Sequence, residues 1–358
     1  MPAPPSTSAL PPIDTSIARE LCPAHPPPRV AVCVAGGART LPRPQVYLTI
    51  RRNLIEAFGG RVSVFFHLNR GDSPPRVRLP TQPRDYGFAP ITVDSAALQA
   101  PREALRPLAE RINDDDGRQY LASSLAATGG GASSIMNGRG ECWNQDPYTR
   151  VPNHRMRLLL HYANMRGCYD MVAAAERRRA DNALFDWILW TRADVAYYAS
   201  VPPYCLWNSS FAYFSPGPSY GRKHPISERV TTADEVHESC MVVPRAHAEH
   251  VLRDMLTIFA RAQPSDEVCR RAPGGFPEAF MRFALAARSG HTFDVGDRLR
   301  LGLRPVPVRT AAIAAVIVRQ NRSSRAQCAN WGALALLVPG LDAWSCAEYM
   351  YARGSGRS

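Results

Sequence analysis

Two short polar segments directly follow apolar runs, and their residue types suit the binding of a phosphate group. The first is Gly36-Gly37-Ala38-Arg39-Thr40, which comes after RVAVCVA. Glycines let backbone N–H groups approach an anion closely, and an arginine pairs with phosphate oxygens. The spacing matches neither a Walker loop nor the G-x-G-x-x-G dinucleotide motif. Gly36, Gly37 and Arg39 are therefore candidate phosphate-binding residues, and a purely structural turn is the alternative.

The second segment is Arg192-Ala193-Asp194, which ends an apolar run that begins after Asp186. A carboxylate at the end of a central strand can hold a divalent cation, and that cation can neutralise a departing diphosphate. Arg192 is a second candidate for a phosphate contact. The alternative is an ion pair between Arg192 and Asp194 that closes the strand.

Two acidic segments nearer the C-terminus offer groups for proton transfer. Asp234 and His237 lie in the cluster ADEVHES, which could position an acceptor hydroxyl, act as a general base or complete a metal site. A solvated loop would have the same residues. Glu278 follows Pro277 at the start of a predicted helix, where the helix dipole alone favours an acidic residue.

The elements that must position these residues follow from hydrophobic periodicity. Apolar β-branched runs predict strands over 29–37 and 61–68, with a helix over 45–58 between them, which is a βαβ unit. An amphipathic helix over 154–179 leads into a strand over 185–194. Further expectations, from residue 91 onward, are strands at 91–93, 211–214 and 239–243, helices over 96–112, after Pro244 and over 277–290, and a long loop or lid over 113–150.

This order predicts an α/β protein with a mostly parallel, Rossmann-like sheet flanked by helices, in one main domain. In such sheets ligands bind at the carboxyl ends of the strands, where Gly36 and Asp194 are expected. Repeated prolines predict an extended, solvated arm over 1–28. The main domain is expected over 29–318, and an extension containing arginine, glycine and serine over 319–358.

Composition narrows the classes of partner. The formal net charge is +12, with 43 Lys+Arg against 31 Asp+Glu, and the only lysine is Lys223. Dispersed arginines in an alanine- and proline-rich background indicate a compositional bias, and no RNA-recognition pattern accompanies them, so a nucleic-acid partner is not expected. No window reaches the roughly 18–20 apolar residues of a membrane span.

The nine cysteines are odd in number and form no CxxC pair. This pattern indicates neither a zinc ribbon nor a compact disulfide framework, and most of the cysteines are expected to be small buried side chains. Two sequons, at Asn208 and Asn321, matter only in a secretory lumen. The N-terminal residues lack the pattern of a signal peptide, so a cytosolic chain, a chain truncated at its start and an unseen route of export all stay open.

Four segments in this order resemble a glycosyltransferase of the GT-A type, and in particular a group of poorly characterised glycosyltransferase-like proteins of plants, algae, bacteria and large viruses. They are VAVCVAGGART followed by VSVFFHL; HYANMRGCYDMV followed by FDWILWTRADVAYY; SYGR with ADEVHESCMVVPR; and FPEAFMRFALAARSGHTF. The resemblance spans residues 29–292.

The resemblance implies a nucleotide-sugar donor and a divalent metal, commonly Mn²⁺ and alternatively Mg²⁺. Carried over, Arg39 contacts the phosphate or the nucleotide of the donor, Arg192 and Asp194 stand for the donor and metal motif, Asp234 faces the acceptor and Glu278 lies near the sugar. The usual motif has two acidic residues, whereas Arg192 stands in the first place here. Metal binding then needs a further ligand, for which His237 is the candidate.

Three hypotheses follow for the function. The leading one is transfer of a sugar from a nucleotide-sugar donor to the hydroxyl of a glycan, protein or lipid acceptor, with Asp234 or Glu278 as the base. The second is a catalytically silent GT-A-like domain that binds a nucleotide or glycan, and the third is an arginine-rich RNA-binding protein.

Overall fold

The structure is a computed structural model. It describes residues 11–72, 91–127, 152–181, 183–197, 199–216 and 236–262, together with 281, 284–285, 306, 308–310 and 315–317. The strands are β1 (Arg29–Gly37), β2 (Arg61–Asn69), β3 (Gly71–Asp72), β4 (Ile91–Thr92), β5 (Pro107–Asn113), β6 (Trp187–Arg192), β7 (Val195–Tyr197), β8 (Ala212–Pro216), β9 (Val236–Pro244), β10 (Val308–Thr310) and β11 (Ala315–Ile317).

Helices connect and cover these strands. The α-helices are α1 (Ser16–Leu21), α2 (Pro44–Thr49), α3 (Gln99–Leu105), α4 (Arg118–Ala126), α6 (Pro152–Arg178), α7 (Arg245–Ala248) and α8 (Met255–Arg261). Short 3₁₀ turns are η1 (Ala38–Thr40), η3 (Ala96–Leu98) and η4 (Tyr204–Leu206), and π-helical segments are η2 (Ile50–Glu56) and η5 (Glu249–Asp254).

The main sheet has seven strands in the order β10-β8-β9-β6-β1-β2-β5. Strand β9 runs antiparallel to both of its neighbours, and the other paired strands of this sheet run parallel. The expected α/β class with a mostly parallel sheet is thus confirmed. β1 lies between β2 and β6, so the two segments singled out by the sequence end neighbouring strands.

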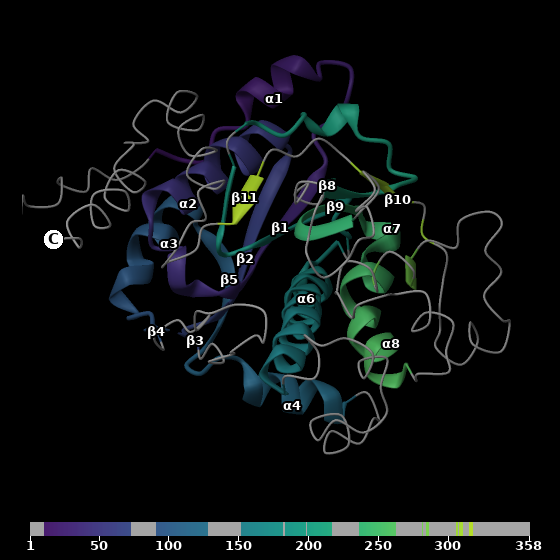
Figure 1. The fold of residues 1–358 in the computed structure, drawn as a ribbon. Helices are drawn as coiled ribbons and strands as arrows, with labels where there is room; N and C mark the ends of the chain where they lie inside the picture. Colours follow the sequence, from purple (N-terminus) through teal and green to yellow (C-terminus); the bar gives the residue numbers. More distant parts are fainter. Residues whose placement is uncertain are drawn as a thin grey trace, which may run out of the picture.

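Both faces of β1 are buried, which explains its continuous apolar run. Ala31, Cys33 and Ala35 face the layer formed by α6 and α8, while the alternate valines of β1 face the layer formed by α2 and η2. Figure 1 shows these helix layers on opposite sides of the sheet. The predicted helix over 154–179 is α6, and its apolar face covers the sheet.

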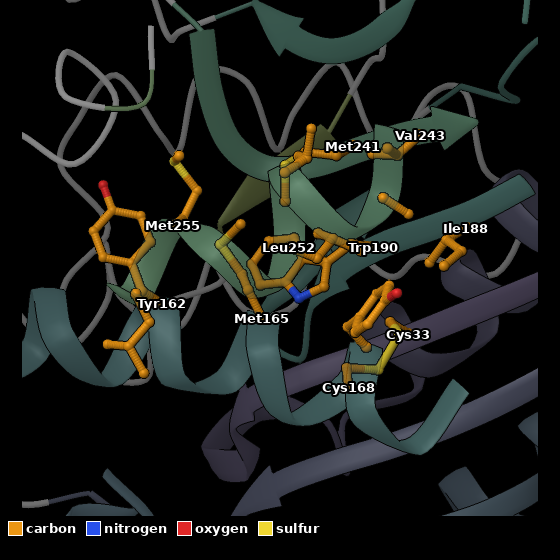
Figure 2. Close-up of a cluster of buried hydrophobic side chains, with 14 of the residues drawn as sticks. Cys33, Tyr162, Met165, Cys168, Ile188, Trp190, Met241, Val243, Leu252 and Met255 are labelled. Carbon is orange, nitrogen blue, oxygen red and sulfur yellow. A yellow bond between two sulfur atoms is a disulfide. The ribbon is translucent and has the colours of Figure 1, made fainter. Parts of the chain in front are cut away.

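A disulfide bond joins Cys33 on β1 to Cys168 on α6, inside the core beneath Trp190 of β6 (Figure 2). A second joins Cys22, after α1, to Cys205 in η4. Four of the described cysteines, Cys22, Cys33, Cys168 and Cys240, are buried as expected, but the sequence analysis did not predict the two cross-links, and among the described cysteines only Cys240 is free. The paired residues are 135 and 183 positions apart, so no local spacing signals them.

The N-terminal segment differs from the expected extended arm. Residues 11–28 include α1 and pack on the domain through three kinds of contact. Arg51 Nη2 donates to the Pro12 carbonyl at 2.7 Å, the Tyr204 hydroxyl donates to the His25 carbonyl at 2.9 Å, and Cys22 is cross-linked. The proline content of this segment predicted a solvated backbone. In the structure, however, the carbonyls of Pro12 and His25 accept hydrogen bonds from the buried side chains of Arg51 and Tyr204.

Two further expectations need correction. The helix predicted over 96–112 stops at Leu105, because Arg106 adopts φ +49° and the chain continues as edge strand β5. The predicted loop over 113–150 contains α4, whose Leu121 and Leu125 pack into the core beside α6. Residues 128–150, most of the predicted helix over 277–290, and all of 319–358 lie outside the described residues.

Candidate functional site

The candidate site lies at the carboxyl edge of the sheet, where the parallel strands end in polar residues or glycine. The register aligns Gly37 of β1 with Asn69 of β2, and Asn69 with Asn113 of β5. On the other side of β1, Ala35 is paired with Arg192, the last residue of β6. The Gly36-Gly37-Ala38-Arg39 segment therefore emerges directly beside Arg192-Ala193-Asp194.

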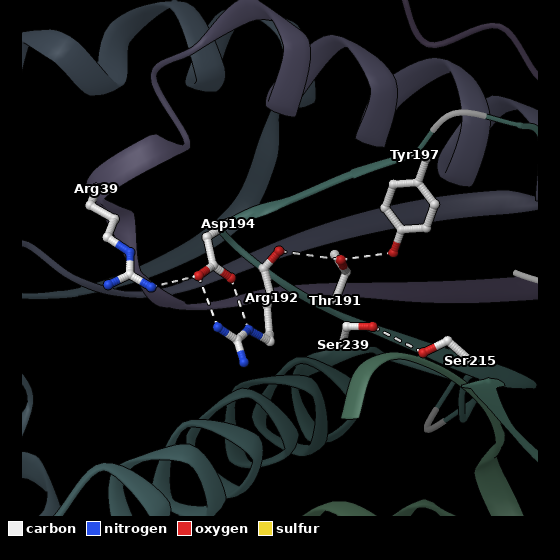
Figure 3. Close-up of polar contacts among 7 residues, drawn as sticks. All are labelled: Arg39, Thr191, Arg192, Asp194, Tyr197, Ser215 and Ser239. Carbon is white, nitrogen blue, oxygen red and sulfur yellow. Dashed lines mark hydrogen bonds and ion pairs between the residues drawn. The ribbon is translucent and has the colours of Figure 1, made fainter. Parts of the chain in front are cut away.

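Asp194 is the centre of a compact ion-pair cluster, which we call the Arg39–Asp194–Arg192 cluster (Figure 3). Arg192 Nε donates to Asp194 Oδ1 and Arg192 Nη2 donates to Asp194 Oδ2, both at 2.8 Å. Arg39 Nη2 donates to Oδ2 at 2.8 Å. The ion pair between Arg192 and Asp194, which was the alternative interpretation of this segment, is formed, and Arg39 joins it.

The electrostatics of this cluster follow from its burial. The Asp194 side chain is 5% exposed, against 16% for Arg39 and 23% for Arg192. Burial alone would raise the pKa of Asp194, but the two guanidinium groups outweigh it and hold that pKa well below its usual value. Within the cluster two guanidinium groups meet one carboxylate, and the arginines are its more exposed members.

The glycines before Arg39 leave space beside this cluster. Gly36 has φ +106°, a conformation that favours glycine, and an added Cβ would lie 3.9 Å from Asn164 Nδ2. Gly37 has φ −65°, and a Cβ added there would meet no atom of the described residues within 4 Å. Within the described part of the chain, the backbone of Gly37 thus borders open space beside two guanidinium groups, an arrangement suited to an anion.

Buried hydrogen bonds behind the cluster fix the turn that carries Asp194. The Ala193 N–H donates to the Ala35 carbonyl at 2.9 Å, which ties the turn to β1. The fully buried Tyr197 donates its hydroxyl to Thr191 Oγ1 at 2.8 Å, and its own N–H donates to Thr49 Oγ1 at 3.0 Å. The carboxylate is therefore held by the scaffold and not by the arginines alone.

Asn164 of α6 is a site neighbour that the sequence analysis did not identify. Its Oδ1 accepts from Asn69 Nδ2 at 3.3 Å, and Asn69 Oδ1 accepts from Asn113 Nδ2 at 2.7 Å. These three amides extend the polar edge from the Gly36 backbone towards β5. The sequence feature that could have identified it is a polar residue, Asn164, within the apolar stripe of the predicted helix over 154–179.

The other predicted site residues are not brought into this cluster by the described part of the chain. Asp234 and Glu278 lie outside the described residues. The backbone of His237 belongs to β9 and pairs with Ser215 of β8, and its side chain is outside the description. Asp186 lies at the opposite end of β6, where its Oδ2 accepts the Arg29 N–H at 2.7 Å and serves the fold.

The residues around Asp194 do not fit a divalent cation. Both carboxylate oxygens already accept guanidinium N–H groups, and a cation placed there would face two positive charges. Among the described residues, no three His, Cys, Asp or Glu side chains gather as a metal-binding group. No step is therefore assigned to a metal on Asp194, and the Mn²⁺ or Mg²⁺ site with His237 stays a prediction.

Comparison with known proteins adds no assignment, since neither a family model nor a curated protein matches the chain. Within the described ranges, none of the helices combines the length and apolar character needed to span a bilayer.

Acid should weaken the fold through Asp194. Its pKa is lower in the folded chain than in the unfolded chain, so its contribution is complete above about pH 5 and is lost as pH falls below the unfolded value of about 3.9. We expect the urea midpoint to fall between about pH 5 and pH 2. In Asp194→Asn the urea midpoint should fall less steeply with pH. The same pH dependence as in the parent chain would show that titration of Asp194 does not cause the loss of stability in acid.

Proposed function

We propose that this protein is a GT-A-like glycosyltransferase that binds the diphosphate of a nucleotide-sugar donor at Arg39 and Arg192. The observation that carries the proposal is the pair of guanidinium groups that Asp194 holds together at the carboxyl ends of β1 and β6, beside the backbone of Gly37. This is the edge of an α/β sheet where ligands bind. The Rossmann-like, GT-A identity of the sheet is part of the proposal.

In the proposed reaction, the bond between the anomeric carbon and the diphosphate oxygen breaks, and its electron pair stays on the diphosphate. The guanidinium groups of Arg39 and Arg192 neutralise the charge that develops there. Asp194 is a positioning residue, because it fixes both arginines without touching the ligand. The acceptor oxygen bonds to the anomeric carbon and loses its proton to a base, for which Asp234 and Glu278 are the sequence candidates.

The direct test is thermal stabilisation of the full chain by UDP- and GDP-sugars, with and without Mn²⁺. The proposal expects stabilisation by at least one nucleotide sugar, retained when a chelator replaces the metal. Absence of stabilisation by any nucleotide at saturating concentration would overturn donor binding. Stabilisation only in the presence of Mn²⁺ would instead support the metal site predicted from the sequence.

Removal of either arginine should weaken donor binding selectively. Arg39→Ala and Arg192→Ala each remove a charge-assisted contact worth about 1.5–3 kcal/mol, so the dissociation constant for the nucleotide sugar should rise about 10- to 150-fold. Titration calorimetry measures this. Arg52→Ala is the matched control, because Arg52 is an exposed arginine on η2. An equal loss in the control would indicate nonspecific charge attraction.

Gly37→Ala separates binding from stability. The added methyl group meets none of the described residues and the backbone is already in a conformation open to alanine, so the free energy of unfolding should change by less than about 1 kcal/mol. If phosphate approaches this backbone, the methyl group occupies its place and affinity should fall at least about tenfold. Unchanged affinity would remove Gly37 from the site.

A catalytically silent GT-A-like domain is the second candidate. It is favoured by the occupied oxygens of Asp194, which leave no metal ligand in the described cluster. Both candidates predict nucleotide binding, so the discriminating measurement is turnover. Release of free nucleoside diphosphate from the bound donor, in the presence of a panel of acceptors, supports the enzyme, and binding without release supports the silent domain.

A further inference from the structure

The pairing of the cysteines bears on where this chain folds. Of the five cysteines that the structure describes, four form disulfides, Cys22–Cys205 and Cys33–Cys168. Cys33 and Cys168 are fully buried between β1 and α6. Their bond must therefore form while the chain folds, not by later oxidation at the surface. Cytosolic reductants keep such thiols reduced, whereas a secretory lumen allows them to pair.

One of the two sequons lies on the surface close to a disulfide. Asn208-Ser209-Ser210 begins three residues after Cys205, and all three residues are exposed. The backbone of Asn208 is held in place, because its N–H donates to the Tyr213 hydroxyl at 2.9 Å and its carbonyl accepts from that hydroxyl at 3.2 Å. The modification sequence is thus presented on a defined turn.

The side chain of Asn208 is oriented in a way that leaves its nitrogen available. Its Oδ1 accepts the Ser210 N–H at 2.9 Å. Among the described residues, no hydrogen bond uses the carboxamide nitrogen, and the exposed side chain leaves room for a bulky substituent. A glycan attached here would extend into solvent without displacing any packed group.

We propose that this protein folds in an oxidising secretory lumen and carries an N-linked glycan on Asn208. The donor is a lipid-diphosphate-linked oligosaccharide supplied by that compartment. The Asn208 Nδ2 forms a bond to the anomeric carbon and loses one proton. The bond from that carbon to the diphosphate oxygen breaks, and the lipid diphosphate leaves with the electron pair. The inference is independent of the glycosyl transfer proposed above.

The test begins with the full chain isolated from the cells that make it, with thiols alkylated at lysis. Peptide mapping is expected to find Cys22 linked to Cys205 and Cys33 linked to Cys168. Enzymatic release of N-glycans in heavy-oxygen water is expected to convert Asn208 into labelled aspartate. Alkylated, unpaired Cys33 and Cys168 would overturn the oxidising compartment. An unlabelled Asn208 in a chain with both disulfides would overturn the glycan.

Matched variants, expressed through a eukaryotic secretory pathway, distinguish the sequon from the fold. Ser210→Ala destroys the sequon and Ser210→Thr preserves it, while both keep the backbone N–H that contacts Asn208. Asn208→Gln and Ser210→Ala should lose the glycan-dependent gel shift at this site, and Ser210→Thr should retain it. Asn321→Gln, at the other sequon, should leave the Asn208 label unchanged. Retention of that label in Ser210→Ala would contradict the proposal.

Discussion

Asp194→Ala is expected to destabilise the folded protein by about 3 kcal/mol, at the low end of the range for breaking a buried ion pair. The carboxylate is 5% exposed and accepts hydrogen bonds from both Arg39 and Arg192. Without it, two neighbouring guanidinium groups of like charge lose the carboxylate that lies between them. Their partial exposure allows water to compensate in part, which is why the low end applies. Urea unfolding of the variant against the parent chain measures the loss.

Two companion variants sharpen this prediction. Asp194→Asn keeps the shape and removes the charge, and it should be destabilised less than Asp194→Ala. The triple variant Arg39→Ala, Arg192→Ala, Asp194→Ala removes all three charges, so it should be more stable than Asp194→Ala alone, because the repulsion between the two guanidinium groups is removed with the carboxylate. A triple variant less stable than the single variant would show that packing, not charge, holds this turn.

Asp194→Ala is also expected to weaken nucleotide-sugar binding, since the proposal makes it the residue that orients both arginines. Loss of a positioning carboxylate frees the guanidinium groups to adopt other rotamers, so binding must order them again. Calorimetry should therefore give a less favourable entropy of binding in Asp194→Ala than in the parent chain. An unchanged affinity in a folded Asp194→Ala protein would remove Asp194 from the site.

Removal of the Cys33–Cys168 disulfide should have the largest effect on stability. It closes a loop with a sequence separation of 135, for which the chain-entropy relation gives about 5 kcal/mol. This is comparable with the total stability of many domains, about 5–15 kcal/mol, so Cys33→Ala/Cys168→Ala should unfold at a much lower temperature or fail to fold. Scanning calorimetry of the oxidised parent and the double variant measures the difference.

A control is needed because each change also removes a buried sulfur. Cys240 is fully buried and free, so Cys240→Ala reports the cost of losing a thiol without losing a cross-link. We expect the double variant Cys33→Ala/Cys168→Ala to lose more than twice as much free energy of unfolding as Cys240→Ala. If the double variant loses no more than twice the free energy of unfolding that Cys240→Ala loses, the covalent link contributes nothing to stability beyond the packing of its sulfur atoms.

Much of the fold could be predicted because burial on both faces leaves an unmistakable local pattern. The strand at 29–37 and the amphipathic helix at 154–179 were predicted in this way, and both are confirmed as β1 and α6. The edge strand β5 was predicted as helix, because it is half solvated and has no such pattern. The helix α1 was missed for a different reason, since its attachment depends on Cys205 and Tyr204, far along the chain.

For the candidate site, the residue types and the strand ends that carry them could be predicted from the sequence alone. The sequence could not determine whether Asp194 would bind a metal or an arginine, because either is compatible with Arg192-Ala193-Asp194. The register of β1 against β6 brings Arg39 to that carboxylate, 155 positions away, so both carboxylate oxygens accept guanidinium N–H groups in this structure. Hydrophobic periodicity along the chain indicates which side chains are buried. The partner of a buried charge is set by contacts between distant segments, and such contacts do not affect that periodicity.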